Sequence, residues 1–533
     1  MRATTLLGLS LLVSACSTAP TPIDDPEDSV IVDDDKADNY FSSSAQEFVL
    51  TGKSSVTLDA AMAGKPEAER VAAAKKLISE KQIAIAWFVT QYLVDKEDED
   101  PNKSFGGFGG MAKGGMWDEL GVTARADGLT FDFTFKQLAA GGKNLISKLP
   151  IKTVGGKQTF DLDIGKPTNT EMGQLETNNE WYRQAPWDAW DPAKATAAQK
   201  ETITFAIAKE TASSDAFWDM KKLVADGTLD IDVYFGWDYH SDYHLKHSKE
   251  FFTWLKGQGF TAPVASWDKL THTSGAFTRH VKADGKDVTV EVRIFFGKPG
   301  TETDPDTDAG GKVLEDDVRA SLKTRDVVVY SGHSGPFYGF ALANWNKTTE
   351  GDLDDSDIRA MPLASKYQLV VAEACDTYQI GEAFLENPAK HGKNVNVLTT
   401  TSFSNAATPV TVEDFVTALL AHDSQQRLRP QTQLSLLTKL DSASADAGFH
   451  SMYGIHGIDE DPGLHPFAVT ANFGATCRAN ADCGGPGNLC VSMHGKKQCT
   501  AACAADAACG TGWSCKSVAS TSTSTIYGRA CAH

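Results

Sequence analysis

The sequence has no stripe of basic residues and, after its first fifteen positions, no apolar segment long enough to cross a membrane. Proteins that bind phosphate backbones need clustered Lys and Arg, whereas this chain has a formal net charge of −20. The charge therefore argues against nucleic acid as a partner. Hydrophobic residues make up 41% of the 533 positions, which is typical of globular proteins and, at this length, predicts two to four domains.

The N-terminus has the pattern of an export signal. Met1 and Arg2 are followed by the apolar stretch 6–12, which is too short to span a bilayer, so residues 1–15 are expected to form a signal peptide. The next segment, 16–39, is rich in Pro and Asp and nearly devoid of core-forming side chains. Such a segment cannot bury enough apolar surface to fold, so it predicts an acidic tether.

The end of the signal peptide resembles the lipoprotein box of bacteria, in which small residues precede a cysteine that becomes lipidated. Here the sequence is Val13-Ser14-Ala15-Cys16, and the resemblance implies that Cys16 carries the lipid and begins the mature chain. Ser17, rather than an aspartate, implies sorting to the outer membrane. We therefore expect a lipid-anchored protein of the cell envelope, and an ordinary secretory peptide is the alternative.

Cysteine is nearly absent from the middle of the chain. Ten are present, and only Cys375 lies between Cys16 and the C-terminal tail. An even, dense set of cysteines in an exported chain indicates a disulfide-rich module, which we place at 471–533 as two four-cysteine repeats. The sequence does not decide which cysteines pair. The tail cysteines are Cys477, Cys483, Cys490, Cys499, Cys503, Cys509, Cys515 and Cys531.

Two further domains are expected between the tether and the tail. Residues 40–225 combine strand-like stretches with a long helical pattern from Glu67 to Leu93, which predicts an α+β domain of unknown role. Residues 226–470 alternate strand-like and helical segments, which is typical of an α/β fold with a mostly parallel sheet between helices. Functional sites in such sheets form at the carboxyl ends of the strands.

A histidine and a cysteine follow two of the expected strands. The runs VVVY at 327–330 and LVVA at 369–372 are short, apolar and β-branched, as expected for strands that are buried on both faces. His333 comes shortly after the first run and Cys375 shortly after the second. Neighbouring parallel strands would bring the imidazole and the thiol to the same edge of the sheet. A thiol is weakly ionised near neutral pH and needs a base of this kind to act as a nucleophile.

The motifs YSGHSG and AEACDT resemble those of caspase-like cysteine peptidases, the group that includes caspases, legumain, clostripain and gingipains. The resemblance covers roughly residues 228–470. It implies a three-layer caspase-like fold and cleavage of peptide bonds in protein or peptide substrates, with no cofactor required for the chemistry. It also implies that Cys375 is the nucleophile and His333 the general acid/base, and that the backbone N–H groups of Ser334 and Cys375 form the oxyanion hole.

Two acidic residues flank the expected nucleophile. Glu373 matches the acidic position of the family's motif, and Asp376 directly follows the cysteine. Ser334 stands where the family usually has glycine, with Gly335 one position later. This departure keeps an inactive caspase-like scaffold, acting as a surface binding or adhesion lipoprotein, as the alternative function.

A histidine cluster suggests a third function. His240, His244 and His247 would share one face of a helix near a strand end, with Asp238 and Asp242 beside them. Histidine is a common metal ligand, but the pattern lacks the glutamate of the His-Glu-x-x-His motif. A metal-binding protein is therefore the less favoured alternative.

The acidic segment 304–315 has the spacing of a calcium loop, although its sixth place is Ala309 rather than glycine. Calcium is therefore the one cofactor that the sequence suggests. A solvated acidic linker in front of a helix is the alternative. The four candidate ligands are Asp304, Asp306, Asp308 and Glu315.

Replacing Cys16 with serine should release the protein from the membrane. The thiol is the attachment point of the expected lipid, and no segment of the mature chain has the apolar length to anchor it otherwise. Fractionation of cells that express the wild type and Cys16→Ser measures the change, with Ser14→Ala as a control that keeps the small-residue box. Equal membrane partitioning of the wild type and Cys16→Ser would exclude a lipid anchor at this position.

Overall fold

The structure is a computed structural model that describes most of the chain from Tyr40 onward. Cys16, the predicted signal peptide and the tether lie outside the described residues. Within the described ranges the fold is mixed α/β, with roughly 30% helix and 32% strand, and no helix there is long and apolar enough to cross a membrane. The described residues are 40–99, 118–175, 190–238, 242–334, 339–390, 394–405, 407–457, 461–469, 472–519 and 526–533.

An eight-stranded sheet forms the centre of the region expected to be α/β. Its strands are β1 Phe41–Ser42, β8 Thr228–Phe235, β9 Phe277–Ala283, β10 Lys286–Phe296, β11 Val327–Ser331, β14 Gln368–Glu373, β15 Val395–Thr400 and β16 Tyr453–His456. Five adjacent strands are parallel, in the order β10, β8, β11, β14 and β15. Antiparallel strands lie at both edges, β9 beside β10 and β16 then β1 beside β15. The predicted mostly parallel sheet is confirmed.

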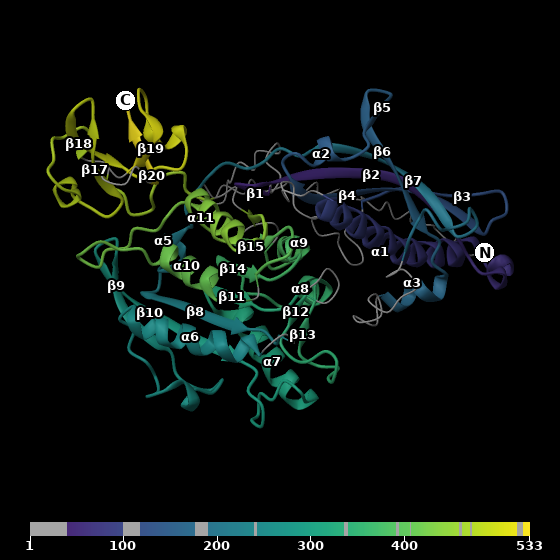
Figure 1. The fold of residues 1–533 in the computed structure, drawn as a ribbon, viewed down its shortest axis with the longest axis horizontal. Helices are drawn as coiled ribbons and strands as arrows, with labels where there is room; N and C mark the ends of the chain where they lie inside the picture. Colours follow the sequence, from purple (N-terminus) through teal and green to yellow (C-terminus); the bar gives the residue numbers. More distant parts are fainter. Residues whose placement is uncertain are drawn as a thin grey trace, which may run out of the picture. The chain divides into compact units, whose positions relative to one another are not determined.

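Helices cover both faces of this sheet (Figure 1). They are α6 Tyr243–Gly257, α7 Asp308–Thr324, α8 Asp355–Ala360, α9 Tyr378–Glu386, α10 Val410–Leu419 and α11 Gln433–Asp446. Side chains along β11 alternate between the faces: Val327 and Val329 pack with α6, α10 and α11, whereas Val328 and Tyr330 pack with α7, α8 and α9. Burial on both faces explains why the sequence of this strand is continuously apolar. A short ladder, β12 Phe340–Ala341 with β13 Asp352–Leu353, follows β11.

The N-terminal region contains a second sheet, which is antiparallel and has the strand order β3, β4, β2, β7, β6 and β5. Aromatic side chains of this sheet pack against the apolar face of α1, the long helix predicted from the sequence, to form a separate core. The α+β character predicted for this region is confirmed. The strands are β2 Ala45–Thr57, β3 Asp118–Ala124, β4 Thr130–Gly142, β5 Lys152–Val154, β6 Lys157–Gly165 and β7 Lys200–Lys209. The helices are α1 Glu67–Glu99, α2 Leu145–Lys148, α3 Asn169–Leu175 and, before β8, α5 Met220–Leu223.

The first described residues connect the two sheets. β1 pairs with β16 at the edge of the large sheet, and the chain then continues into β2 of the second sheet. Tyr40 packs edge-on against Tyr378, with 5.3 Å between the ring centroids. The Tyr378 hydroxyl donates a hydrogen bond to the Glu47 carboxyl group on β2. Since Tyr378 is the first residue of α9, the N-terminal region holds the start of the helix that follows Cys375.

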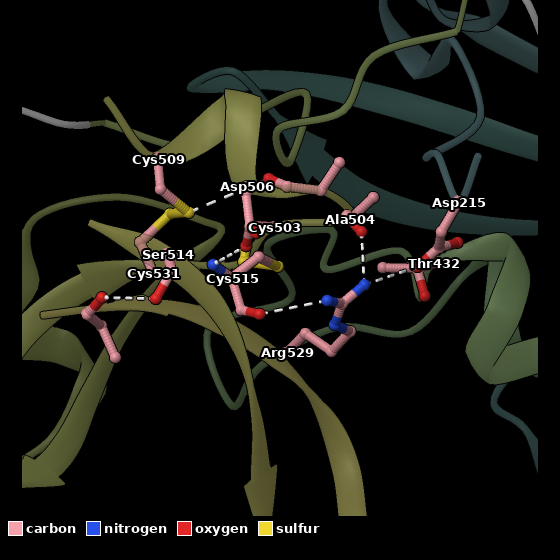
Figure 2. Close-up of a disulfide and its surroundings, with 12 residues drawn as sticks. Asp215, Thr432, Cys503, Ala504, Asp506, Cys509, Ser514, Cys515, Arg529 and Cys531 are labelled. Atoms are coloured by element: carbon pink, nitrogen blue, oxygen red, sulfur yellow. Dashed lines mark hydrogen bonds and ion pairs between the residues drawn. A yellow bond between two sulfur atoms is a disulfide. The ribbon is translucent and has the colours of Figure 1, made fainter. Parts of the chain in front are cut away.

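The C-terminal tail forms two hairpins, each held by two disulfides. β17 Asn488–Met493 pairs with β18 Lys496–Ala501, and β19 Ser514–Ala519 pairs with β20 Ile526–Ala532. In each repeat the first cysteine is bonded to the third and the second to the fourth, so the sequence repeat is also a structural repeat. Figure 2 shows the second repeat. The disulfides are Cys477–Cys490, Cys483–Cys499, Cys503–Cys515 and Cys509–Cys531.

Removing one disulfide should destabilise its hairpin. Replacing both Cys483 and Cys499 with alanine should lower the free energy of unfolding of the module by about 2–5 kcal/mol, because a small domain with little aliphatic core depends on such crosslinks. Amide hydrogen exchange over 488–501 measures the loss. Cys375→Ala, which removes a thiol but no disulfide, is the control. Equal exchange in the two variants would contradict this role of the bond.

Candidate active site

The pairing of β11 with β14 places His333 and Cys375 at neighbouring strand ends. The two strands are parallel, and the last pair in their register is Ser331 opposite Glu373. The Gly332 amide donates to the Glu373 carbonyl at 3.1 Å, which extends the ladder by one step. His333 and Cys375 each come two residues after that last pair, and adjacent strands lie about 4.8 Å apart. The register thus gives the two residues equivalent positions at one edge of the sheet.

The order in which the chain adds parallel strands to the sheet reverses at β8, and the carboxyl end of β8 lies at this same edge of the sheet. From β8 the chain passes to β10 on one side and then to β11 on the other, and such a reversal leaves a crevice at the carboxyl ends of the strands. A narrow pocket lies there, with room for about one water molecule (about 10 Å³). Residues that line it include Gly236, Asp238, His244, His247, Gly332, Glu373 and Ser404.

Cys375 is the only cysteine among the described residues that is outside a disulfide, and it is half-buried. Burial and the adjacent Asp376 carboxylate raise the pKa of its thiol to about 12, although hydrogen bonds with Ser404 act in the opposite direction. At pH 7 the thiol is therefore almost entirely protonated. Asp376 has a left-handed backbone conformation, with φ of 53°, and its amide donates to the Ser402 carbonyl at 3.1 Å. This turn leads the chain from β14 into α9.

His333 is held through its backbone and through ring packing. Its carbonyl oxygen accepts hydrogen bonds from the Tyr330 hydroxyl and from the Ala341 amide, the latter at 3.1 Å. Trp345 meets the imidazole at a right angle, with 5.5 Å between the ring centroids. His333 and Ser334 are both buried. These contacts restrict the position of the imidazole, which a proton-transfer group requires.

Glu373, expected to flank the site, is the last residue of β14 and is buried on the pocket wall. Burial raises the pKa of its carboxyl group to about 8, although the Tyr453 hydroxyl donates a hydrogen bond to it at 3.1 Å. The carboxyl group is therefore mostly protonated at pH 7. In that state it offers hydrogen bonds to the pocket rather than a negative charge.

The predicted histidine cluster lies partly in this pocket. His244 and His247 are on α6, and both are buried and line the pocket beside Asp238. Burial lowers the pKa of each of these imidazoles to about 4, so both rings are neutral at pH 7. His240 lies outside the described residues. Within the part of the chain that the structure describes, neither histidine belongs to a group of three ligand side chains close enough to share an ion.

The four residues considered as calcium ligands are not gathered around one point. α7 begins at Asp308, so Asp308 and Glu315 lie on a helix rather than on a loop. The Asp306 carboxylate instead pairs with Lys347 at 2.6 Å, and the Asp304 carboxylate accepts a backbone amide hydrogen at 2.7 Å. Among the described residues these carboxylates form no shared ion-binding group. Helix formation from Asp308 onward differs from the loop that wraps around the ion in a calcium site.

Two groups of the candidate site, Ser404 and Tyr453, had not been identified from the sequence. Ser404 follows β15, Tyr453 begins β16, and Asp238 follows β8. Only the order of the strands brings the first two to this site, and the sequence does not specify that order. Asp238, expected beside the histidine cluster, comes at the carboxyl end of a parallel strand and lines the pocket with His244 and His247.

Comparisons with known proteins do not assign the chain to a family. No family model matches it, and neither a curated protein nor a solved structure matches it. The geometry described above is therefore the basis for a functional proposal.

Replacing Asp376 with asparagine should make the Cys375 thiol more reactive. The carboxylate raises the thiol pKa, and asparagine also adopts the left-handed conformation, so the variant removes a charge and keeps the turn. We expect alkylation by iodoacetamide at pH 8 to accelerate several-fold, since one pKa unit changes the thiolate population about tenfold. Asp316→Asn, which removes an exposed carboxylate on α7, is the control. An unchanged rate in Asp376→Asn would show that this charge does not act on the sulfur.

Proposed function

We propose that the protein is a cysteine endopeptidase that cleaves peptide bonds through a thioester on Cys375. The observation that carries the proposal is the register of β11 and β14, which gives His333 and Cys375 equivalent positions at the carboxyl edge of a parallel sheet. A mostly parallel sheet with helices on both faces further supports the caspase-like resemblance of the two motifs.

The high pKa of Cys375 favours proton transfer during the attack over a preformed ion pair. The thiol proton moves to His333 as the sulfur attacks the substrate carbonyl carbon, and a tetrahedral intermediate forms. The imidazolium then protonates the leaving amine as the carbon–nitrogen bond breaks, which leaves an acyl-thioester. Water, deprotonated by the same imidazole, attacks the thioester, releases the carboxylic acid product and restores the thiol.

Backbone amides of Ser334 and Cys375 are the proposed donors to the oxyanion. Two neighbouring amides already have partners, since Gly332 donates to the Glu373 carbonyl and Asp376 to the Ser402 carbonyl, both at 3.1 Å. Ser334 and Cys375 follow the ends of β11 and β14, the same positions that the family resemblance implies. Negative charge on the substrate oxygen would then develop next to a protonated, uncharged Glu373 rather than a carboxylate.

The proposed setting is the cell envelope, with the protein attached to the outer membrane through a lipid on Cys16. Four disulfides support an oxidising compartment, because such bonds persist outside the cytosol. The substrates would be proteins or peptides present there, and the reaction sequence above uses no cofactor.

Two observations favour an inactive scaffold as the second candidate. The pocket has room for about one water molecule, and the thiol is protonated at pH 7. Ser334, in place of the family's usual glycine, adds a side chain next to the proposed oxyanion site. A surface binding or adhesion lipoprotein would keep the fold without turnover.

Peptidase activity should depend on Cys375 completely and on His333 less completely. Cys375→Ala should abolish turnover of a fluorogenic peptide library, because no nucleophile remains. His333→Ala should lower kcat/KM about a hundred- to ten-thousandfold, the usual contribution of proton transfer. His280→Ala removes an exposed imidazole on β9 and should keep full activity.

The same assay distinguishes the two candidate functions. Full turnover by Cys375→Ala would refute the peptidase mechanism. If the wild type cleaves no member of the library, even after proteolytic activation, the result favours the scaffold. Labelling by a peptidyl electrophile that requires both Cys375 and His333 would support the peptidase.

A further inference from the structure

A second cavity lies where the disulfide module meets the rest of the protein, and its volume is about 190 Å³. Arg429, between α10 and α11, lines one side, and Arg529 of β20 lines the other. α10 separates this cavity from the candidate active site, since Thr408 lines the active-site pocket before the helix and Ala421 lines the cavity after it. The cavity is therefore a distinct site.

His465 offers a hydrogen-bond donor to this cavity. The side chain lines the cavity and is only 3% exposed. Its Nδ1 accepts the amide hydrogen of Phe467 at 3.1 Å, so the neutral ring carries its proton on Nε2. Burial, together with the charge of Arg429, lowers the pKa of the imidazole to about 3, which keeps the ring neutral at physiological pH. Among the described residues, this Nε2 group has no hydrogen-bond partner.

The charge of Arg429 is only partly compensated. Its Nε lies 3.3 Å from the Asp423 carboxylate, and its Nη1 donates to the Asn488 carbonyl at 3.0 Å. Asp423 also pairs with Arg427 at 2.7 Å, so one carboxylate serves two guanidinium groups. Nη2 of Arg429 is buried and finds no partner in the described part of the chain. A buried cation with an unused N–H group favours an anion beside it.

Arg529, shown with its partners in Figure 2, supplies a second guanidinium group, and it lines the same cavity. Its Nη1 and Nη2 donate to the carbonyls of Ala504 and Cys515, at 2.5 and 3.0 Å. The Asp215 carboxylate lies 4.0 Å away, which is longer than a direct hydrogen bond. The positive charge on this wall is thus weakly compensated as well.

We propose that this cavity binds a small organic carboxylate with an apolar body, the chemistry of a C-terminal amino-acid residue. Donors from Arg429, Arg529 and His465 suit a carboxylate, whose two oxygens accept several hydrogen bonds. Phe217 and Pro430 provide apolar wall for the rest of the ligand. The volume is about nineteen times that of the pocket at the candidate active site, which is more than a simple inorganic anion fills.

Binding there would link the module to the rest of the protein. The donors come from both sides of the cavity, so a ligand that contacts them binds only while the two sides are together. It would therefore stabilise their association by mass action. Binding in this cavity requires no chemistry at Cys375.

Calorimetric titration of the purified full-length protein with N-acetyl-L-leucine tests the proposal. The neutral amide, N-acetyl-L-leucinamide, should not bind, because it lacks the carboxylate. Arg429→Gln should weaken binding of the carboxylate about ten- to a hundredfold, the effect of losing a charge-assisted hydrogen bond. Arg478→Gln is the matched control, since Arg478 is an exposed arginine of the module that does not line the cavity, and it should bind as the wild type does.

A second variant separates ligand binding from folding of the module. Ala421→Leu fills part of the cavity without changing a charge and should also weaken binding about tenfold or more, while hydrogen exchange of the hairpins stays as in the wild type. Equal binding of the amide, no binding by the wild type up to millimolar concentrations, or unchanged binding in Ala421→Leu would overturn the proposal. If inorganic phosphate competes with equal affinity, the cavity is a simple anion site and the proposal of an organic ligand is wrong.

Discussion

The parallel pairing between β11 and β14 determines where the rest of the candidate site lies. A shift of one residue in this pairing would turn every side chain of the strand to the opposite face. Val328 packs into the layer of α7, α8 and α9, whereas Val329 packs into the layer of α6, α10 and α11, so both cores resist such a shift. The buried valines, which have no chemical role, therefore set the relative positions of His333 and Cys375.

Burial also determines the electrostatic character of the site. In a chain with a net charge of −20, the thiol of Cys375, the carboxyl of Glu373 and the imidazole of His244 are all mainly uncharged at pH 7. Burial is the largest cause in each case: it outweighs the opposing hydrogen bonds at Cys375 and Glu373, and the opposing aspartate charges at His244. Chemistry at this edge of the sheet would therefore begin from neutral partners and create charge only in the transition state, where fixed hydrogen-bond donors are most effective.

The sequence predicted those features that depend on local pattern. The β-branched runs predicted β11 and β14, and the spacing of apolar residues predicted α1. Features that depend on distant contacts were not predicted: the pairing of the cysteines, the strand order that brings Tyr453 to Glu373, and the addition of β1 to the large sheet. The acidic segment 304–315 shows a related limit, because ligand spacing alone does not indicate that Asp308 begins a helix.

The pairing of β1 with β16 has a consequence for how this chain can be divided. A fragment that began at position 226 would lack β1 and Tyr40, so it would leave β16 as an open edge and uncover the aromatic face of Tyr378. Open edges recruit strands from other molecules. The two cysteine repeats differ, because each closes its disulfides within itself. A division of the chain ahead of the cysteine repeats would therefore keep every crosslink, whereas a division between the two sheets would break a strand pairing.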